Sequence, residues 1–143
     1  MYTREEMLEF ASNNLLDIFN KLGKREQGAL LGNIVEIAVV KNRKAQSTDK
    51  EGYDMIEDGL EKEIKSCWTL NGKYARWANI TSKFNKCDAF IFIDGVNNKE
   101  YEVPHDVVFF EMSVRPANGG EIYTTEHNLA ILEQYEILNK EGK

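Results

Sequence analysis

Residues 52–68, GYDMIEDGLEKEIKSCW, decide how the rest of the chain is interpreted. Asp58-Gly59 lies between two runs that contain apolar residues, and Asp-Gly in that position is a strong signal for a two-residue hairpin turn. The stretch therefore predicts two antiparallel strands, at about 53–57 and 60–67. It also carries five carboxylates, which belong either to a solvated hairpin or to a group of acids that holds a cation.

The register of this hairpin follows from its turn. A two-residue turn pairs Met55 with Lys62 and places Asp54 opposite Glu63, with Cβ atoms about 4.5–5.5 Å apart. Two opposed carboxylates repel each other, and a divalent cation would compensate them. Lys65 lies two residues beyond Glu63 and therefore projects from the same face. Lys62 points to the other face, where it is expected to pair at most with surface acids. The alternative is a wet hairpin face on which Lys65 simply neutralises Glu63.

The periodicity of the remaining chain predicts one domain, residues 1–143, in the mixed α+β class. Helical spacing favours helices at about 4–22, 25–41, 74–84 and 126–139. The continuous apolar run DAFIFID, residues 88–94, is typical of a strand buried on both faces. We expect it beside the strand that carries Glu63, with a further strand at 107–114. This order predicts a central mixed sheet flanked by helices.

Composition restricts the class of protein. The chain has 143 residues, of which 29% are charged and 42% hydrophobic, and this balance is typical of a soluble globular domain. Its apolar runs are too short to span a bilayer, and its N-terminus lacks a signal-peptide core. Cys67 and Cys87 are expected to be reduced thiols in a cytoplasmic protein. The net charge of −6 counts against a non-specific nucleic-acid binder but allows a local basic surface.

Glu36 is a further candidate, within GNIVEIAVV. Because Ile34, Val35, Ile37 and Ala38 surround it, this helical turn is predicted to be apolar nearly all round and buried. A buried carboxylate needs a partner. The alternative is a surface residue on an ordinary helix.

The spacing of these acids resembles a known signature. GYD, eight intervening residues and then EIK resemble the active-site motif of the PD-(D/E)XK nuclease superfamily, which includes many type II restriction endonucleases. Gly52-Tyr53 stands where the motif has a proline-containing lead. The resemblance extends from Gly32 to Gly95, with an upstream helix that contributes a Glu and a downstream helix followed by a buried strand.

The resemblance implies a restriction-endonuclease-like fold and a Mg²⁺-dependent endodeoxyribonuclease, with Mn²⁺ as a substitute cation. It implies Asp54, Glu63, Lys65 and Glu36 as catalytic residues. Asp54, Glu63, Glu36 and the backbone carbonyl of Ile64 would bind the metal. A homodimer would cut both DNA strands, because one site cuts one strand. The alternatives are a phage or repair nuclease that recognises DNA structure, as a resolvase does, and a non-catalytic DNA-binding module.

Basic residues flank the hairpin and form the candidate DNA contacts. The first group precedes the hairpin and the second follows it: Lys41, Arg43 and Lys44, then Lys73, Arg76 and Lys83. Arg115 and Asn118, in SVRPANGG, are suitable readers of base edges. The alternative for each of these lysines is a solvated surface position.

Overall fold

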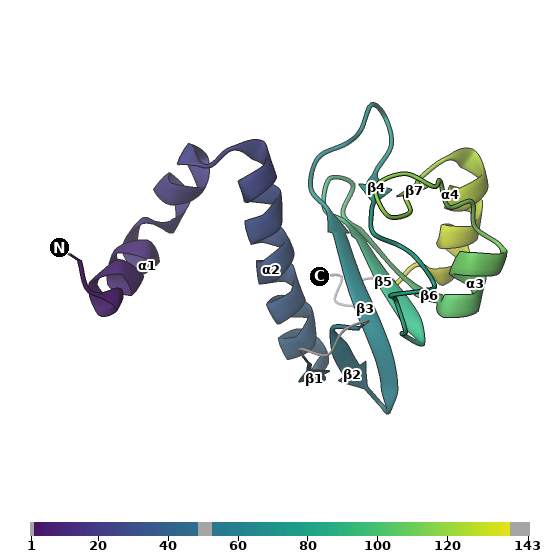
Figure 1. Ribbon diagram of the computed structural model, residues 1–143, viewed down its shortest axis with the longest axis horizontal. Helices are drawn as coiled ribbons and strands as arrows, with labels where there is room; N and C mark the ends of the chain where they lie inside the picture. The colour runs from purple at the N-terminus through teal and green to yellow at the C-terminus, as the bar shows by residue number, and fades with distance from the viewer. Residues whose placement is uncertain (1, 49–52, 138–143) are drawn as a thin grey trace.

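A computed structural model describes residues 2–48 and 53–137 of the chain (Figure 1). Its elements are α1 (Arg4–Lys21), α2 (Lys24–Arg43), β1 (Gln46–Ser47), β2 (Met55–Glu57), β3 (Leu60–Cys67), β4 (Arg76–Trp77), β5 (Ala89–Asp94), β6 (Lys99–Pro104), α3 (His105–Phe110), β7 (Ile122–Tyr123), α4 (Glu126–Leu132) and the 3₁₀ turn η1 (Glu133–Tyr135). Five strands form a mixed sheet in the order β1-β2-β3-β5-β6, and β4 pairs with β7. The predicted mixed α+β sheet flanked by helices is confirmed.

The hairpin has the register that its turn predicts. Met55 pairs with Lys62 and Glu57 with Leu60. Asp58 and Gly59 both have positive φ, 53° and 80°, which is the backbone of a type I′ turn. The predicted strand at 53–57 is shorter in the structure, because β2 begins only at Met55.

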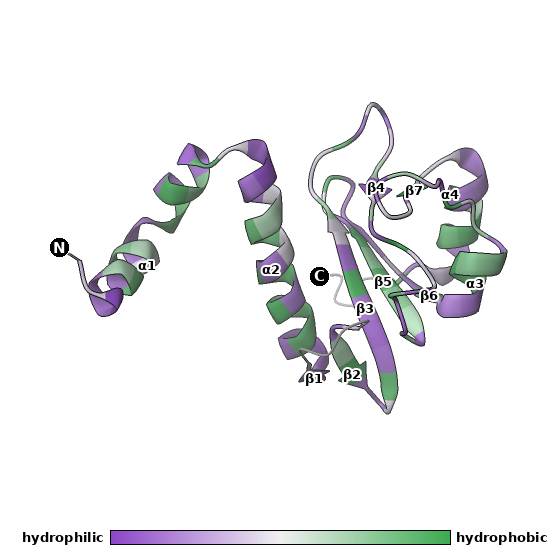
Figure 2. Ribbon diagram, in the orientation of Figure 1, coloured by the Kyte–Doolittle hydropathy of each residue, from purple (hydrophilic) through white to green (hydrophobic). Residues whose placement is uncertain are grey.

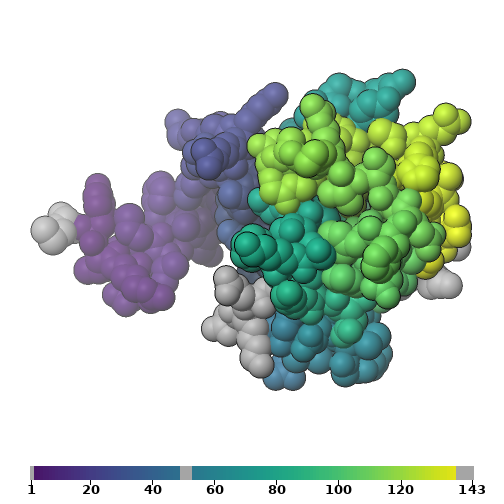
Figure 3. All heavy atoms as spheres, turned by 45° about the vertical axis from the view of Figure 1, so that its right-hand side comes forward, coloured from purple at the N-terminus to yellow at the C-terminus, as the bar shows by residue number. Residues whose placement is uncertain are grey.

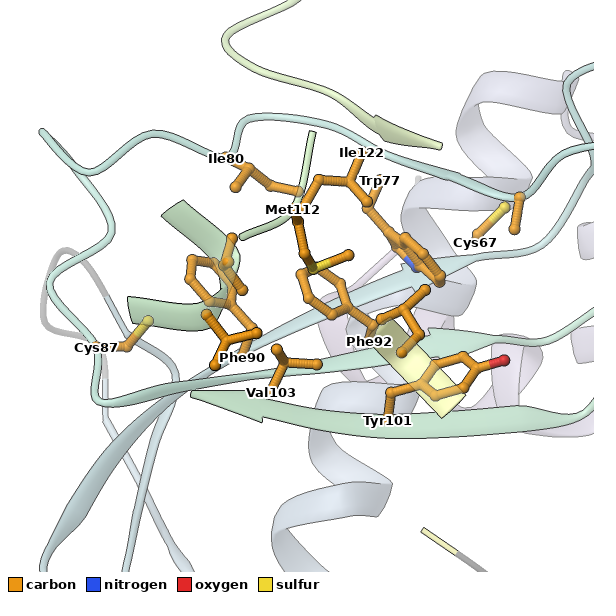
Figure 4. Packing of buried hydrophobic residues seen from close by; sticks show 14 of the residues in the cluster. Cys67, Trp77, Ile80, Cys87, Phe90, Phe92, Tyr101, Val103, Met112 and Ile122 are labelled. Atoms are coloured by element: carbon orange, nitrogen blue, oxygen red, sulfur yellow. The ribbon is translucent and has the colours of Figure 1, made fainter. Parts of the chain in front are cut away.

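The strand β5 lies in the middle of the sheet, as predicted. It runs parallel to β3 and antiparallel to β6. Phe90 and Phe92 enter the larger core together with Trp77 (Figure 4), whereas Ile91 packs with Ile64 in the smaller core under α2. Both faces of β5 are therefore covered, which explains its continuous apolar sequence.

Two predicted elements are wrong. Residues 74–84 form no helix: the short β4 is followed by irregular chain in which Asn79 has a φ of 58°. Residues 107–114 form no strand, because His105–Phe110 is helical and buries Val107 and Val108. A short apolar run such as VVFF suits a buried helix as well as a strand.

The strand β6 was not predicted. Its sequence, KEYEVP, alternates polar residues with the buried Tyr101 and Val103, which is the pattern of a half-buried strand.

The terminal helices lie close to their predicted positions. α1 and α2 differ from the predicted ranges by one or two residues. The predicted helix at 126–139 ends earlier, at Leu132, and continues as η1; residues 138 and 139 lie outside the described part.

Cys67 and Cys87 are both free and buried. Within the described residues, none of the helices combines the length and the apolar character needed to cross a membrane.

Candidate functional site

The side chain of Asp54 is fixed to the strand β3. Its Oδ2 accepts a hydrogen bond of 2.8 Å from the backbone N–H of Ile64, and its own backbone N–H donates to the carbonyl of Lys62 at 2.8 Å. Because β2 begins only at Met55, the Asp54 carboxylate takes the place of a strand partner at this edge. The N–H and C=O of one strand residue point to the same edge, so the carbonyl oxygen of Ile64 also faces it.

Glu63 and Lys65 lie together on one face of β3. The Nζ of Lys65 is 3.4 Å from Oε2 of Glu63, and it donates a hydrogen bond of 3.2 Å to the backbone carbonyl of Asn79. Both side chains are largely covered, with 13% exposure for Glu63 and 17% for Lys65. The lysine is therefore held between a carboxylate and a loop carbonyl.

Glu36 reaches the same cluster from α2. It shares a hydrogen bond with Asp54, and its pKa is raised from 4.5 to about 7. Burial is the largest cause, followed by repulsion from Asp54 and Glu63, while Lys65 acts in the opposite direction. The structure therefore places Glu36 with the hairpin acids, 27 positions away from Glu63 in sequence.

The predicted burial of this helical turn is wrong. Ile34 and Ile37 are 43% and 69% exposed, and Val39 is the residue of α2 that is buried. Glu36 itself is half-buried. α2 packs on the sheet through one stripe only, and Glu36 lies at the border of that stripe.

The pKa shifts indicate that the cluster carries more negative than positive charge. The pKa of Glu63 is raised, first by burial and then by repulsion from Asp54, although Lys65 lowers it. Three carboxylates thus influence one another while Lys65 is the cation that acts on both Glu36 and Glu63. A cation bound beside them would relieve this repulsion.

A cavity of about 300 Å³ opens on the Glu36–Asp54 side of the cluster. Its lining consists of Glu36, Ile37, Val40, Lys41, Ser47, Thr48 and Asp54. One of the basic residues predicted to contact DNA, Lys41, therefore lies beside two of the acids. Acidic, hydroxyl and ammonium groups surround the same space.

The donor chemistry of the cluster suits a hard divalent cation, because oxygen ligands and surplus negative charge are what Mg²⁺ requires. The side chains do not form a finished ligand set. Across residues 2–48 and 53–137, the structure shows no group of three or more His, Cys, Asp and Glu side chains arranged to hold a metal ion. Metal binding would therefore require at least one of the carboxylate side chains to move toward the ion.

Lys62 departs from its predicted surface role. It is buried, and its Nζ lies 2.6 Å from Glu57 and 2.8 Å from Glu102. β6 supplies Glu102, and the unpredicted place of β6 beside β5 is the reason for the error. Lys62 and Lys65 do point to opposite faces, as the register requires.

Arg43 belongs to the same ion-pair network. It contacts Glu57, Glu100 and Glu102 at 2.7–2.9 Å. Burial lowers its pKa, but the hydrogen bonds that Arg43 donates to these carboxylates outweigh burial and raise the pKa overall. This guanidinium is engaged inside the protein and is not offered to a phosphate backbone, in contrast to its predicted role.

The other predicted DNA contacts are scattered. Arg76 and Asn118 both bind the buried Glu121, so their polar groups have an internal partner. The remaining cations lie against rings or at the surface. Lys73 lies over Tyr74, Lys83 over Phe84 and Arg115 over Tyr123, while Lys41 and Lys44 are exposed.

Sequence reasoning missed Asn79, whose carbonyl holds Lys65. The segment is fixed by the loop that follows α3: the N–H of Asn79 donates to Asn118, and the N–H of Ile80 donates to Gly120. Gly120 has a φ of 101°, and a Cβ there would overlap the carbonyl oxygen of Ile80. The pair Gly119-Gly120 was the available signal, since glycine often marks a close backbone approach.

Comparison with known proteins gives little. No family model matches the sequence, and no curated protein matches it. Among solved structures, the chain is similar to a bacterial homing endonuclease, I-Ssp6803I, at 18% identity and a TM-score of 0.48. The alignment covers 71% of this chain and 75% of that one. A likeness of this size carries no argument about activity.

Proposed function

We propose that the chain is a metal-dependent endonuclease that hydrolyses phosphodiester bonds in DNA. The observation that carries the proposal is the convergence of Glu36, Asp54, Glu63 and Lys65 at one edge of β3. The Asp–x₈–Glu–x–Lys spacing resembles the PD-(D/E)XK signature, and the hairpin register supports that resemblance. The cytoplasm, where Cys67 and Cys87 stay reduced, is the proposed location.

Each residue has a role that its position supports. Asp54 and Glu63, with the carbonyl of Ile64 and with Glu36, would hold Mg²⁺ or Mn²⁺. When bound, such a cation supplies the Lewis-acid chemistry for phosphodiester hydrolysis. Lys65 is held close to Glu63, where its ammonium can orient an attacking water and stabilise negative charge that develops on the phosphate.

The path of the DNA backbone is proposed to cross the cavity beside Glu36. Lys41 lines this cavity and is exposed, so it can neutralise a phosphate next to the acids. Two copies of the chain would be needed to cut both strands. A restriction-type, sequence-specific cut is the form of activity that we propose first.

Incubation of supercoiled plasmid with the protein and Mg²⁺ tests this proposal. Discrete linear bands are expected, with no cleavage in EDTA. Cuts that depend on a cruciform would indicate a structure-specific nuclease instead. Binding of DNA without cleavage, in Mg²⁺ and in Mn²⁺, would leave a non-catalytic DNA-binding module and would overturn the proposal.

A further inference from the structure

The chain between β3 and β5 is basic, although the whole chain has a net charge of −6. Residues 66–87 contain no carboxylate but four basic side chains, those of Lys73, Arg76, Lys83 and Lys86. Glu121 engages the guanidinium of Arg76, whereas Lys83 and Lys86 are exposed. Figure 3 shows residues 80–87, in teal, at the surface beside the green stretch that follows α3. This end of the segment is therefore suited to an anionic partner.

A short turn fixes the exposed end of the segment. The backbone N–H groups of Phe84 and Asn85 donate to the carbonyl of Thr81, at 3.2 and 2.9 Å. Oδ1 of the buried Asn85 accepts a further hydrogen bond of 2.7 Å from the N–H of Thr81. The turn is therefore held from inside the protein, and it presents Lys83 and Phe84 to solvent.

Phe84 is an exposed aromatic residue beside a cation. It is 60% exposed, and Nζ of Lys83 lies 5.5 Å from the centroid of its ring. An exposed phenyl ring can stack on a nucleobase, and such stacking tolerates any base because every base has a π-face. An ammonium group beside the ring can neutralise a backbone phosphate. Two consecutive residues thus offer both contacts that hold an unstacked nucleotide.

A groove of about 480 Å³ lies beside this ring. The turn contributes Thr81, Ser82 and Phe84 to its lining, and the chain from α3 onward contributes Phe109, Val114 and Pro116. The helix α3 is largely hydrophobic (Figure 2). All the residues that line the groove are uncharged, whereas Lys83 and Lys86 lie outside its lining. This separation matches a nucleotide, whose base is flat and uncharged and whose phosphate is charged.

Both ends of the segment 79–87 lie against the acid cluster. At one end, the carbonyl of Asn79 accepts the hydrogen bond from Lys65, and a Cβ on Gly119, which lines the groove, would lie 2.7 Å from Oδ1 of Asn79. At the other end, burial and then the charge of Glu63 raise the pKa of Cys87. The groove is therefore next to Glu63 and Lys65, where a base beside the cleaved bond would lie.

We propose that Phe84 stacks on a nucleobase of the bound DNA next to the cleaved bond, and that the groove holds this base outside the helical stack. Lys83 and Lys86 neutralise the flanking phosphates. This contact rests on the proposed function for its substrate and adds the residues that orient the strand. Turning a base out costs pairing and stacking energy, and the cost is smallest where the base is already unpaired. DNA with unpaired bases is therefore expected to bind more tightly than a fully paired duplex.

Affinities for a paired duplex and for the same duplex with a central bubble of mismatches test the base contact. In an Asp54→Asn background, where DNA stays uncut, the bubble is expected to bind about tenfold more tightly. Phe84→Ala should lose this gain, and Phe84→Tyr should keep it because its ring still stacks. Equal affinity of the parent for both duplexes, or a gain that survives in Phe84→Ala, overturns the proposal.

Phe110→Ala is the matched control for Phe84→Ala. Both phenylalanines are exposed, at 60% for Phe84 and 81% for Phe110, but Phe110 lies on α3 outside the lining of the groove. Phe110→Ala should keep the gain, and both variants should unfold in urea at the midpoint of the parent. Equal loss of the gain in both variants would contradict a contact specific to the groove.

Lys83→Ala tests the phosphate contact. It is expected to reduce the slope of log K against log salt by about one for both duplexes. Lys21→Ala, at an exposed position of α1, should leave the slope unchanged. A Lys83→Ala slope equal to that of the parent would contradict the contact between this lysine and the backbone.

The nuclease and the base contact can fail separately. A wild-type protein that binds the bubble through Phe84 but cuts no DNA in Mg²⁺ contradicts the nuclease and supports the base contact. A wild-type protein that cuts DNA, with a Phe84→Ala variant that binds the bubble as tightly as its parent, contradicts the base contact alone. A chain that binds neither duplex contradicts both.

Discussion

The carboxylate of Asp54 accepts a 2.8 Å hydrogen bond from the backbone N–H of Ile64, the residue between Glu63 and Lys65. This one contact joins the lone Asp of the motif to the strand that carries the acid–x–Lys part. The same carboxylate acts on Glu36 of α2, whose pKa it raises. The motif is thus assembled by a hydrogen bond to the backbone as well as by the hairpin turn.

Asp54→Asn is expected to abolish cleavage and to leave the fold intact. The amide oxygen of asparagine can still accept from Ile64, but the charge that would bind a cation is lost. Asp88→Asn is the matched control, because Oδ2 of Asp88 also accepts a 2.8 Å hydrogen bond from a β3 backbone N–H, that of Glu61. Plasmid cleavage and urea unfolding measure the two effects. Cleavage by Asp54→Asn at the wild-type rate would remove Asp54 from the site.

The hairpin and the central strand were predictable because local rules determine them. The Asp58-Gly59 turn fixes a register, and a run apolar at every position requires cover on both faces. The segment at 74–84 was not predictable in the same way. Its apolar residues occur at helical spacing, but the chain there is held by hydrogen bonds to residues 118 and 120, a distant loop whose position the sequence does not reveal.

The structure brings the predicted acids together, whereas the groups that support them were not predicted. Asp54, Glu63 and Lys65 follow from the strand register. Glu36 follows from the resemblance alone, because the burial inferred from its apolar neighbours is wrong. The contact of Lys65 with the carbonyl of Asn79 could not be predicted, because every residue type has a backbone carbonyl. The network of Arg43 was missed because its partner strand β6 was not predicted.

The loop behind Asn79 gives a stability prediction. Gly120→Ala is expected to lower the free energy of unfolding by more than about 2 kcal/mol, because the added Cβ meets the backbone of Ile80 and the φ of 101° is strained for alanine. Gly72→Ala is the control, since Gly72 also has positive φ, 65°, but open space around it. It should cost about 1 kcal/mol. Equal midpoints for the two variants in urea would contradict this account of the loop.

The raised pKa of Glu36 predicts how stability depends on pH. The pKa of Glu36 is about 7 in the folded chain against an ordinary value of 4.5, so the folded state binds the proton more tightly than the unfolded state does. The stabilisation is present below pH 4.5 and is lost as the pH rises through 7. In EDTA, Glu36→Gln should therefore gain stability over the wild type between these pH values.

The gain is expected on the order of 1 kcal/mol at pH 8, because Glu36 is only half-buried and solvent screens its neighbours. Urea unfolding at pH 4.5 and pH 8 measures it. Glu111→Gln, at an exposed position on α3's C-terminal end, controls for the general effect of removing a carboxylate. A difference between Glu36→Gln and wild type that does not change with pH would show that Glu36 is not coupled to the cluster.

Substitution of Lys41 and of Arg43 should distinguish a residue that contacts DNA from one that stabilises the fold. In an Asp54→Asn background, where DNA stays uncut, Lys41→Ala is expected to reduce the slope of log K against log salt by about one. Arg43→Ala should leave that slope unchanged and lower the free energy of unfolding, because Glu100 loses its partner while Glu57 and Glu102 keep only Lys62. Filter binding at several salt concentrations measures the first effect. A slope that falls for Arg43→Ala and not for Lys41→Ala would reverse the assignment.

Lys65 and Lys62 lie three residues apart on β3, and their substitution should affect different properties: cleavage for Lys65 and stability for Lys62. Lys65→Ala is expected to lose about 10²–10³-fold in cleavage rate with little change in stability, since Lys65 is held mainly by Glu63 and one carbonyl. Lys65→Arg should also be impaired, because a broad guanidinium does not replace a compact ammonium.

Lys62→Ala removes a buried cation from Glu57 and Glu102. It should cost about 3 kcal/mol, the lower end for a broken buried pair, because Arg43 still serves both acids. Below its unfolding temperature, Lys62→Ala should cut at nearly the wild-type rate. Single-turnover cleavage and thermal unfolding of both variants distinguish these outcomes, and a Lys62→Ala protein that is folded but as inactive as Lys65→Ala would place the chemistry on the opposite face of the strand.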